Sequence, residues 1–281
     1  NFNNKITNSR VVVFGSTGFI GSSVISIIKN KKNKNIIFNS KNFDLTNKRI
    51  FNKSKYIPKN SDIVLFAAAQ APVKNERMFL KNILMLENFM KIKNIFNIKK
   101  IIYVSSDAVY SDSKRPLNEF SPTKPENLHG LMHLTREIFL KNLFKEKLTI
   151  VRPTLIYGKN DPHNGYGPNK FIRDAKKNKE IKIFGRGEEI RDHVSIKDVS
   201  LLIYNLLFYE TNGVINAASG YPISFLKIAN KIKKKNNNVT KITYIKRNGP
   251  MPHNGYRTFD ISSLKNNFPK LKIKIFLKDY F

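Results

Sequence analysis

The feature that most constrains the fold is a short segment near the N-terminus, in which four apolar residues at positions 11–14 lead directly into Gly15, Gly18 and Gly21. Glycine has no Cβ, so Gly15 and Gly18 are expected to turn tightly and to let backbone N–H groups approach a pyrophosphate. Gly21 would let the following helix pack close to the strand. A strand before the glycines and an amphipathic run after them favour a dinucleotide-binding loop over a glycine-rich surface turn, which is the alternative.

The rest of the chain alternates short apolar runs with helical patterns, which is typical of a parallel sheet with crossover helices. Up to about residue 155, we expect strands at 11–14, 36–38, 63–66, 101–104 and 148–151, and helices at 78–95 and 128–144. Further on, the pattern predicts strands at 181–184, 214–216 and 242–245, and helices at 196–208 and 225–232. The fold class predicted is α/β: a Rossmann-type doubly wound parallel sheet with a smaller C-terminal α/β substrate-binding region.

The pattern also predicts how the 281 residues divide. Residues 157–169 are rich in Gly, Pro, Asn and His and interrupt the alternation, as a loop that leaves the sheet would. We therefore assign residues 1–155 and about 194–217 to a dinucleotide-binding Rossmann domain. Residues about 156–193 and 218–281 form the expected substrate-binding region.

Composition limits the classes of protein that the chain can belong to. Hydrophobic residues make up 41% of the chain, which is too many for a disordered protein, and no apolar run is long enough to span a membrane. No cysteine is present, so disulfides, Cys-ligated metals and a thiol nucleophile are excluded. No export signal is recognisable, and a cytoplasmic location is expected.

The formal net charge of +31 raises nucleic-acid binding as an alternative function. The lysines, however, alternate with asparagines along much of the chain, as they do at residues 29–34 and 231–238. This pattern favours a solvated Lys/Asn-rich surface over a basic stripe with exposed aromatic residues. We therefore expect no nucleic-acid partner, with attraction of anionic metabolites or membranes as a secondary consequence.

Several further landmarks follow the glycine loop in a fixed order. They are Asp44-Leu45, Ala67-Ala68-Ala69, Asn82, residues 103–110 (YVSSDAVY), Arg152-Pro153, Tyr157-Gly158, residues 184–187 (FGRG), residues 191–194 (RDHV), Asp198-Val199 and residues 216–220. Together they resemble the extended short-chain dehydrogenase/reductase family, in its NAD(P)-dependent epimerase/dehydratase branch. This branch modifies nucleotide-linked sugars, and its members are often dimers, so a homodimer stays open.

The resemblance implies a set of cofactor-binding residues. These are Gly15, Thr17, Gly18, Phe19, Ile20, Gly21, Asp44, Leu45, Ala67, Ala68, Ala69, Asn82, Ser105 and His133. Asp44 would meet the adenine end of the cofactor, or else cap a helix that begins near Thr46, and the alanines have core packing as their alternative. The expected second strand ends without an acid to hold the ribose 2′-OH, whereas Lys41 could meet a 2′-phosphate, which favours NADP over NAD.

The resemblance breaks at the catalytic helix. The family places Tyr-x-x-x-Lys there, with the tyrosine as acid/base and the lysine on the nicotinamide ribose, but this chain has His129 and His133. Their i, i+4 spacing puts both imidazoles on one helix face. We expect Ser106 and His129 to act at the reacting carbon and His133 to hold the ribose. A pair without function and a metal site are the alternatives, and the metal site ranks last because no Glu lies inside the pair as in His-Glu-x-x-His.

The resemblance also implies substrate-binding residues: Asp107, Tyr157, Asn169, Arg191 and Arg257. Arg191 and Arg257 would meet the substrate diphosphate, for which the guanidinium fork is suited, with solvated surface arginines as the alternative. Ala108 stands where dehydratases carry a second carboxylate, which disfavours dehydration. Leu155 replaces a frequent asparagine, and residues 161–170 are expected to wall the pocket.

Two hypotheses result from this reading of the sequence. The first is an NAD(P)-dependent epimerase or reductase that acts on a nucleotide-linked sugar by hydride transfer. The second is a protein of the same fold that binds the cofactor and the nucleotide sugar with weak or absent catalysis.

Overall fold

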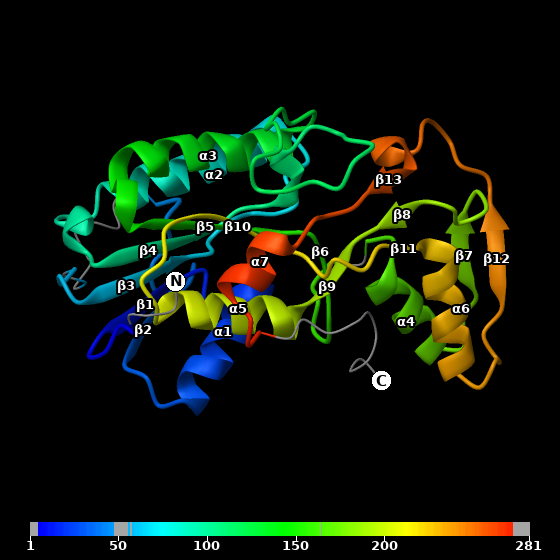
Figure 1. Ribbon diagram of the computed structural model, residues 1–281, viewed down its shortest axis with the longest axis horizontal. Helices are drawn as coiled ribbons and strands as arrows, with labels where there is room; N and C mark the ends of the chain where they lie inside the picture. The colour runs from blue at the N-terminus through cyan, green and yellow to red at the C-terminus, as the bar shows by residue number, and fades with distance from the viewer. Residues whose placement is uncertain (1–4, 48–55, 57, 164, 272–281) are drawn as a thin grey trace.

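The computed structural model describes residues 5–47, 56, 58–163 and 165–271 (Figure 1). Its main sheet has six parallel strands in the order β10-β5-β4-β3-β1-β2. The strands are β1 (Arg10–Phe14), β2 (Asn35–Phe38), β3 (Asp62–Phe66), β4 (Lys100–Val104), β5 (Leu148–Pro153) and β10 (Gly213–Ala217). This is the doubly wound α/β arrangement that the alternating pattern predicts.

Helices cover both faces of this sheet (Figure 1). One face carries α2 (Glu76–Met90) and α3 (Leu128–Phe144), and the other carries α1 (Phe19–Asn30) and α5 (Ile196–Leu207). Successive strand residues point to opposite faces, so Val11 and Val13 enter one apolar core while Val12 and Phe14 enter the other. The short helices η3 (Asp107–Val109), η4 (Lys145–Lys147) and α7 (Ser262–Asn267) complete this part.

A smaller region lies beyond the carboxyl edge of the sheet, at the right of Figure 1. Its strands β7 (Ile181–Phe184) and β12 (Ile242–Ile245) pair in parallel, and α4 (Pro168–Lys176) and α6 (Phe225–Lys235) pack on them around a third apolar core. Three two-residue strands form a second sheet in the order β11-β8-β13: β8 (Ile190–Arg191), β11 (Ile223–Ser224) and β13 (Tyr256–Arg257). Strands β6 (Leu155–Tyr157) and β9 (His193–Ser195) connect the two parts.

The expected elements are confirmed, with two differences. The helix expected at 78–95 begins earlier and ends earlier, because the Asn75 side chain caps it by accepting from the Met78 N–H, and Asn94 adopts a left-handed backbone (φ 62°) before η2 (Ile95–Asn97). Of the loop expected at 157–169, residue 157 belongs to β6 and residues 168–169 begin α4, a helix that was not predicted. The short strands β6, β8, β9, β11 and β13 were not predicted, since two or three residues are too few to show a period.

Two further expectations fall partly outside the described residues. The helix considered after Thr46 would lie mainly on residues 48–55, which the structure does not describe. Asn164, in the loop expected to wall the pocket, is also outside the described residues. Within the described ranges, no helix combines the length and apolar character that a bilayer crossing needs.

The start of α1 packs unusually close to the sheet. A Cβ on Gly21 would lie 2.1 Å from the Gly15 carbonyl oxygen, and a Cβ on Gly15 would lie 2.6 Å from the Ala68 N. Gly15 also has a left-handed backbone, with φ +91°. Glycine at these two positions therefore allows α1, β1 and the end of β3 to meet.

We predict that Gly21→Ala destabilises the fold, because the added methyl group would meet backbone atoms that cannot move aside. The expected loss is about 2–3 kcal/mol of unfolding free energy, or a melting temperature lower by about 5–10 °C, measured by circular dichroism. Gly165→Ala is the control, since no atom lies within 4 Å of a Cβ at that glycine. Equal melting temperatures for the two variants would contradict the packing argument.

Candidate active site

A cleft of about 1340 Å³ follows the carboxyl edge of the main sheet and extends toward the smaller region. Its lining includes the glycine loop after β1, the ends of β3 and β4, the first turns of α3, and residues of β8 and β13. Parallel strands bring their carboxyl ends to one edge, so residues far apart in the sequence meet there.

The glycine-loop end of the cleft fits a dinucleotide. The left-handed backbone is confined to Gly15, whose N–H donates to the Phe38 carbonyl (3.0 Å). Gly18 has φ −69°, and a Cβ there would come no closer than 3.4 Å to the Gly15 oxygen. The fold itself therefore does not require glycine at 18, and the tight turn expected there is made at Gly15. The N-terminus of α1 opens at this point, where backbone N–H groups favour an anion.

Most of the predicted cofactor residues line the cleft. They are Gly15, Thr17, Gly18, Phe19, Ile20, Gly21, Asp44, Leu45, Ala67, Ala68, Ala69, Ser105 and His133. The Asp44 carboxylate accepts from the N–H and hydroxyl of Thr46. Asn82 lies outside the lining, because its buried amide bonds both the N–H and the carbonyl of Gln70. Lys41 is exposed and does not line the cleft.

Helix α3 comes close to η3 because of a glycine. A Cβ on Gly130 would lie 2.0 Å from the Ala108 carbonyl oxygen, so only glycine permits this approach. The Asn127 side chain caps α3 by accepting from the Gly130 N–H. On the other side, Ser106 caps η3: its hydroxyl oxygen accepts from the Ala108 N–H (3.1 Å). The first turn of α3 therefore lies beside Ser106.

The two predicted histidines are adjacent; His133 is buried and His129 is partly buried. Their ring centroids are 4.7 Å apart in an edge-to-face arrangement. The Val73 N–H donates to His129 Nδ1 (3.5 Å), and the Tyr103 hydroxyl bonds His133 Nδ1 (2.8 Å). Burial lowers the pKa of His129, and burial together with the neighbouring His129 and Arg136 lowers the pKa of His133 well below 6.5. Both imidazoles are therefore neutral at neutral pH, and no permanent cation stands at position 133.

Three buried ions support this part of the cleft from beneath. Arg136 donates to the Ala68 carbonyl (2.8 Å) and to the Asn82 carbonyl. Glu137 accepts from the Ser105 hydroxyl (2.6 Å) and pairs with Arg152 (2.9 Å). Sequence reasoning did not assign these roles to Arg136 and Glu137.

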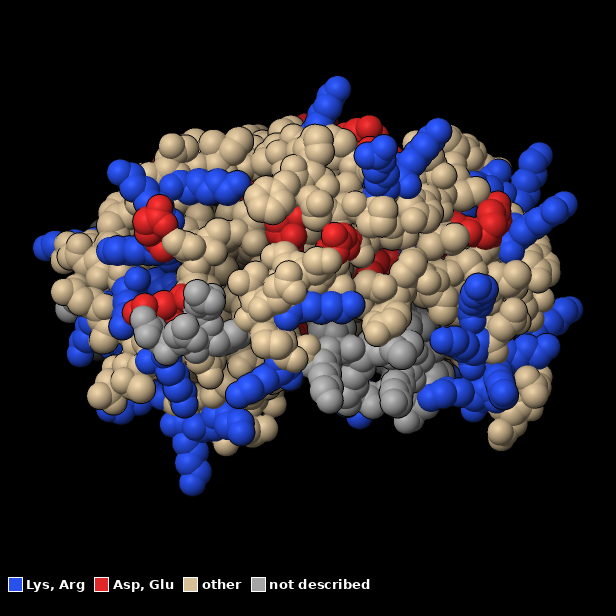
Figure 2. Space-filling view, in the orientation of Figure 1, with Lys and Arg blue, Asp and Glu red and all other residues tan. Residues whose placement is uncertain are grey.

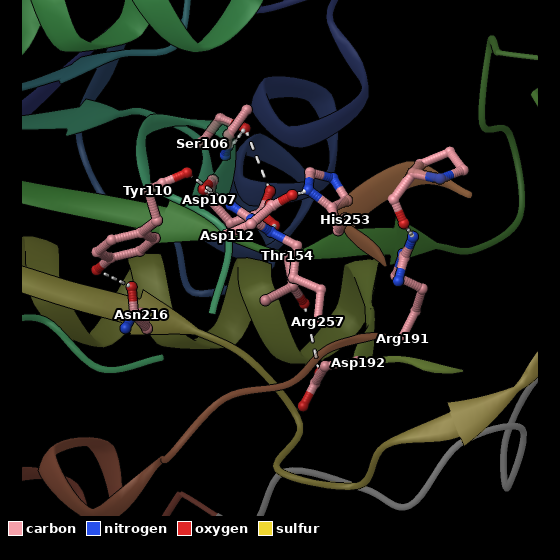
Figure 3. Close-up of polar contacts among 12 residues, drawn as sticks. Ser106, Asp107, Tyr110, Asp112, Thr154, Arg191, Asp192, Asn216, His253 and Arg257 are labelled. Atoms are coloured by element: carbon pink, nitrogen blue, oxygen red, sulfur yellow. Dashed lines mark hydrogen bonds and ion pairs between the residues drawn. The ribbon is translucent and has the colours of Figure 1, made fainter. Parts of the chain in front are cut away.

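At the other end of the cleft, the two predicted arginines already have protein partners (Figure 3). Arg257 Nε donates to Asp107 Oδ2 (2.9 Å), and its Nη1 donates to Asp112 Oδ1 (3.1 Å). Arg191 pairs with Glu189 and donates to the Pro252 carbonyl. Both arginine side chains line the cleft and are almost fully buried.

Of the three remaining predicted substrate residues, two line the cleft and one does not. Asp107 and Asn169 line the cleft, and Asn169 accepts from the Gly158 N–H and donates to Asp161. Tyr157 is buried in the apolar core of the smaller region and does not line the cleft.

Sequence reasoning missed two residues beside Arg257, of which only His253 lines the cleft. Asp112 follows η3, and His253 lies in η5 (Pro252–Gly255), yet His253 Nδ1 and Asp112 Oδ1 are 2.5 Å apart. They are separated by 141 positions in the sequence. The Pro-His-Asn-Gly sequence around His253 is a turn signal, but no local sequence signal points to Asp112 as a site residue.

Comparisons with known proteins agree with this architecture. Two relatives are similar over most of the chain. A Methanocaldococcus jannaschii protein provisionally named UDP-glucose 4-epimerase is 28% identical over 79% of this chain and 81% of its own length. The GDP-6-deoxy-D-talose 4-dehydrogenase of Aggregatibacter actinomycetemcomitans is 26% identical over 78% of this chain and 77% of its own.

Solved structures share the fold. The GDP-L-fucose synthetase from Naegleria fowleri bound to NADP superposes with a TM-score of 0.80 at 21% identity, covering 98% of this chain and 92% of that one. The family model described as "NAD dependent epimerase/dehydratase family" matches residues 11–218. This chain therefore belongs to the NAD-dependent epimerase/dehydratase family.

Proposed function

We propose that the protein is an NAD(P)-dependent epimerase or reductase that acts on a sugar linked to a nucleoside diphosphate. The observation that carries this proposal is one continuous cleft, with the glycine loop at one end, Arg191 and Arg257 at the other, and Ser106 and His129 lining it as well. A dinucleotide on the glycine loop and a diphosphate near the arginines would bring the nicotinamide and the sugar together between them. The names of the two relatives refer to UDP- and GDP-linked sugars, which supports the substrate class.

The residues of the chain suggest how the sugar oxygen would be held. A backbone N–H can only donate, so the Val73 contact makes Nδ1 of a neutral His129 the acceptor and leaves the hydrogen on Nε2. The acid/base role of His129 would then begin from Nε2–H, which donates to the sugar oxygen and stabilises the negative charge that develops there. The Ser106 hydroxyl would be the second group at that oxygen. A bound nicotinamide cofactor would supply hydride transfer.

His133 would face the ribose of the cofactor in the same donor form. If Tyr103 donates to Nδ1, then Nε2 of the neutral ring carries the hydrogen and donates outward. Neither histidine provides the permanent charge of a lysine, so we expect slower turnover than a Tyr-x-x-x-Lys site supports. Because Lys41 lies away from the lining, the preference for NADP rests only on the missing acid at the end of β2.

A thermal-shift screen tests the proposed ligands. We expect NADP or NAD to raise the melting temperature, and one nucleotide sugar among UDP-, GDP- and dTDP-linked hexoses to raise it further. Gly18→Ala should keep the parent melting temperature but lose most of the cofactor shift, since the methyl group would fill the space offered to the pyrophosphate. A cofactor shift with no response to any nucleotide sugar would contradict the substrate class.

His129→Ala tests the group at the sugar oxygen. We expect turnover to fall by about 100-fold or more, because the donor to the developing charge is removed, while cofactor affinity stays within a factor of two or so. Turnover is measured by cofactor absorbance or by sugar-nucleotide chromatography. Leu131→Ala, two positions along α3 at a partly exposed site, is the control. Unchanged turnover in His129→Ala would rule out this role.

A second candidate function is a binding protein that keeps the fold without catalysis. It is favoured by the two neutral histidines at the Tyr-x-x-x-Lys positions, which supply no cation. Under this alternative, the parent protein would bind cofactor and nucleotide sugar without turnover, and the double change His129→Tyr with His133→Lys would create activity.

Stability should depend on pH through the buried histidines. Burial lowers the pKa values of His129 and His133, and lowers that of His193 to about 3, so below pH 6.5 the unfolded chain binds protons that the folded protein does not. The unfolding free energy should therefore fall as the pH drops from 7.5 to 5.5, by about 1.4 kcal/mol for each fully shifted histidine and about 3 kcal/mol together. Urea titrations measure this loss, which His133→Asn should reduce by about half. An unfolding free energy independent of pH would contradict it.

A further inference from the structure

The ionic cluster at the arginine end of the cleft is balanced in charge. Arg257 pairs with Asp107 and Asp112, whereas Arg191 and Arg247 share Glu189, so three guanidinium groups face three carboxylates. Burial lowers the pKa of Arg191, and Glu189, Asp107 and Asp112 oppose that effect while Arg257 adds to it, so the members influence one another. Asp192 is set apart, because its carboxylate accepts from Ser219 and Gly220.

A nucleotide sugar would add two negative charges to this cluster. Its diphosphate is a diester that stays doubly charged at neutral pH, and the arginines already have partners. Phosphate oxygens could replace Asp107, Asp112 or Glu189 as acceptors, but the displaced carboxylates would remain in the cleft. Uncompensated charge in a partly buried site is costly. A proton taken up on binding would reduce that cost.

His253 is placed to take that proton. Its Nδ1 bonds Asp112, which leaves Nε2 with no hydrogen bond to any described residue, and the ring is partly exposed and lines the cleft. Both His253 and Asn254 have left-handed backbones (φ 52° and 49°), an uncommon conformation in residues other than glycine. The Pro252 carbonyl just before them accepts from Arg191 (Figure 3), so η5 is tied to the same cluster.

The charges that face His253 act in opposite directions. Asp112, after η3, places a negative charge at the ring, whereas Arg257 of β13, whose Nη1 lies 3.2 Å from His253 Nδ1, places a positive charge there. Asp107 of η3 and Arg191 of β8 lie one contact further out. Histidine is the side chain that exchanges its proton near neutral pH. An arriving dianion would tip this balance toward the protonated ring.

We propose that His253, held by Asp112, is a proton-linked contact for the substrate diphosphate: binding of a nucleotide sugar protonates His253, whose Nε2–H then donates to a phosphate oxygen. The step adds one proton from solvent to one imidazole nitrogen and breaks no bond. This inference rests on the proposed function, since it assumes that a nucleoside diphosphate sugar is the ligand. It assigns a role to a residue outside the catalytic helix.

Isothermal titration calorimetry measures the proton directly. UDP-glucose and GDP-mannose are titrated into the full chain at pH 7.0 in PIPES and in imidazole, whose ionisation enthalpies differ, and the number of protons follows from the difference in observed enthalpy. Neither ligand titrates near this pH, so uptake must come from the protein. For the one that binds, we expect between zero and one proton taken up by the parent, with more uptake at pH 7.5 than at pH 6.

Two variants at the same position separate charge from proton uptake. His253→Lys supplies a permanent charge, so it should bind within about threefold of the parent with no uptake. His253→Gln should bind about tenfold more weakly, also without uptake, since a charge-assisted hydrogen bond is lost. Melting temperatures of both variants confirm folding.

The outcomes distinguish the two proposals. Binding with the same proton uptake in His253→Lys would overturn the role of His253 and leave the proposed function standing, because one of the carboxylates would then be the acceptor. If NAD(P) binds but neither these nor dTDP-linked sugars bind at millimolar concentration, the proposed function fails and the role of His253 fails with it.

Discussion

The close contact between Gly15 and the chain leaving β3 sets the geometry of the whole cleft. Gly15 lies against Ala67 and Ala68, and Gly21 lies against Gly15, so the start of α1 cannot move without the end of β3. The same loop after β3 makes two hydrogen bonds to α3. The Ala68 carbonyl accepts from Arg136, and the Val73 N–H donates to His129. One loop therefore fixes the distance between the glycine loop and α3.

Helix α3 buries polar groups as well as apolar ones, which include Met132 and Leu140. Its inward face carries His133, Arg136 and Glu137, each with hydrogen-bond partners, while Ile138 and Phe139 remain about half exposed. Removing one partner from such a network would leave a buried charge without compensation, which costs more than losing an apolar contact of similar size. The polar interior of α3 thus fixes the helix in one position, which a site that aligns two ligands requires.

Helix α3 also shows what the sequence could and could not predict. The spacing of apolar residues predicts the bounds of α3 correctly, and the β1 run with its three glycines predicts the Rossmann-type sheet. Both predictions succeed because helices and strands leave a local period in the sequence. Periodicity does not say which face is buried when the polar residues find partners on other elements. Asp112 and His253 meet through tertiary contacts across 141 positions, and their pairing has no local signal. Tyr157 matched a landmark by order alone, and order does not fix the direction of a side chain.

The excess of basic residues acts at a longer range than the ionic cluster. On the face shown in Figure 2, Lys and Arg gather toward the two ends, with acidic side chains between them. A net charge of +31 attracts anions from a distance and raises their encounter rate, but salt screens it beyond about 10 Å. At the arginine end of the cleft, Arg191, Arg257 and the neighbouring Arg247 are already paired with carboxylates. The overall charge therefore favours the arrival of anions, whereas retention of the proposed ligand would require an exchange of partners within a cluster that begins neutral.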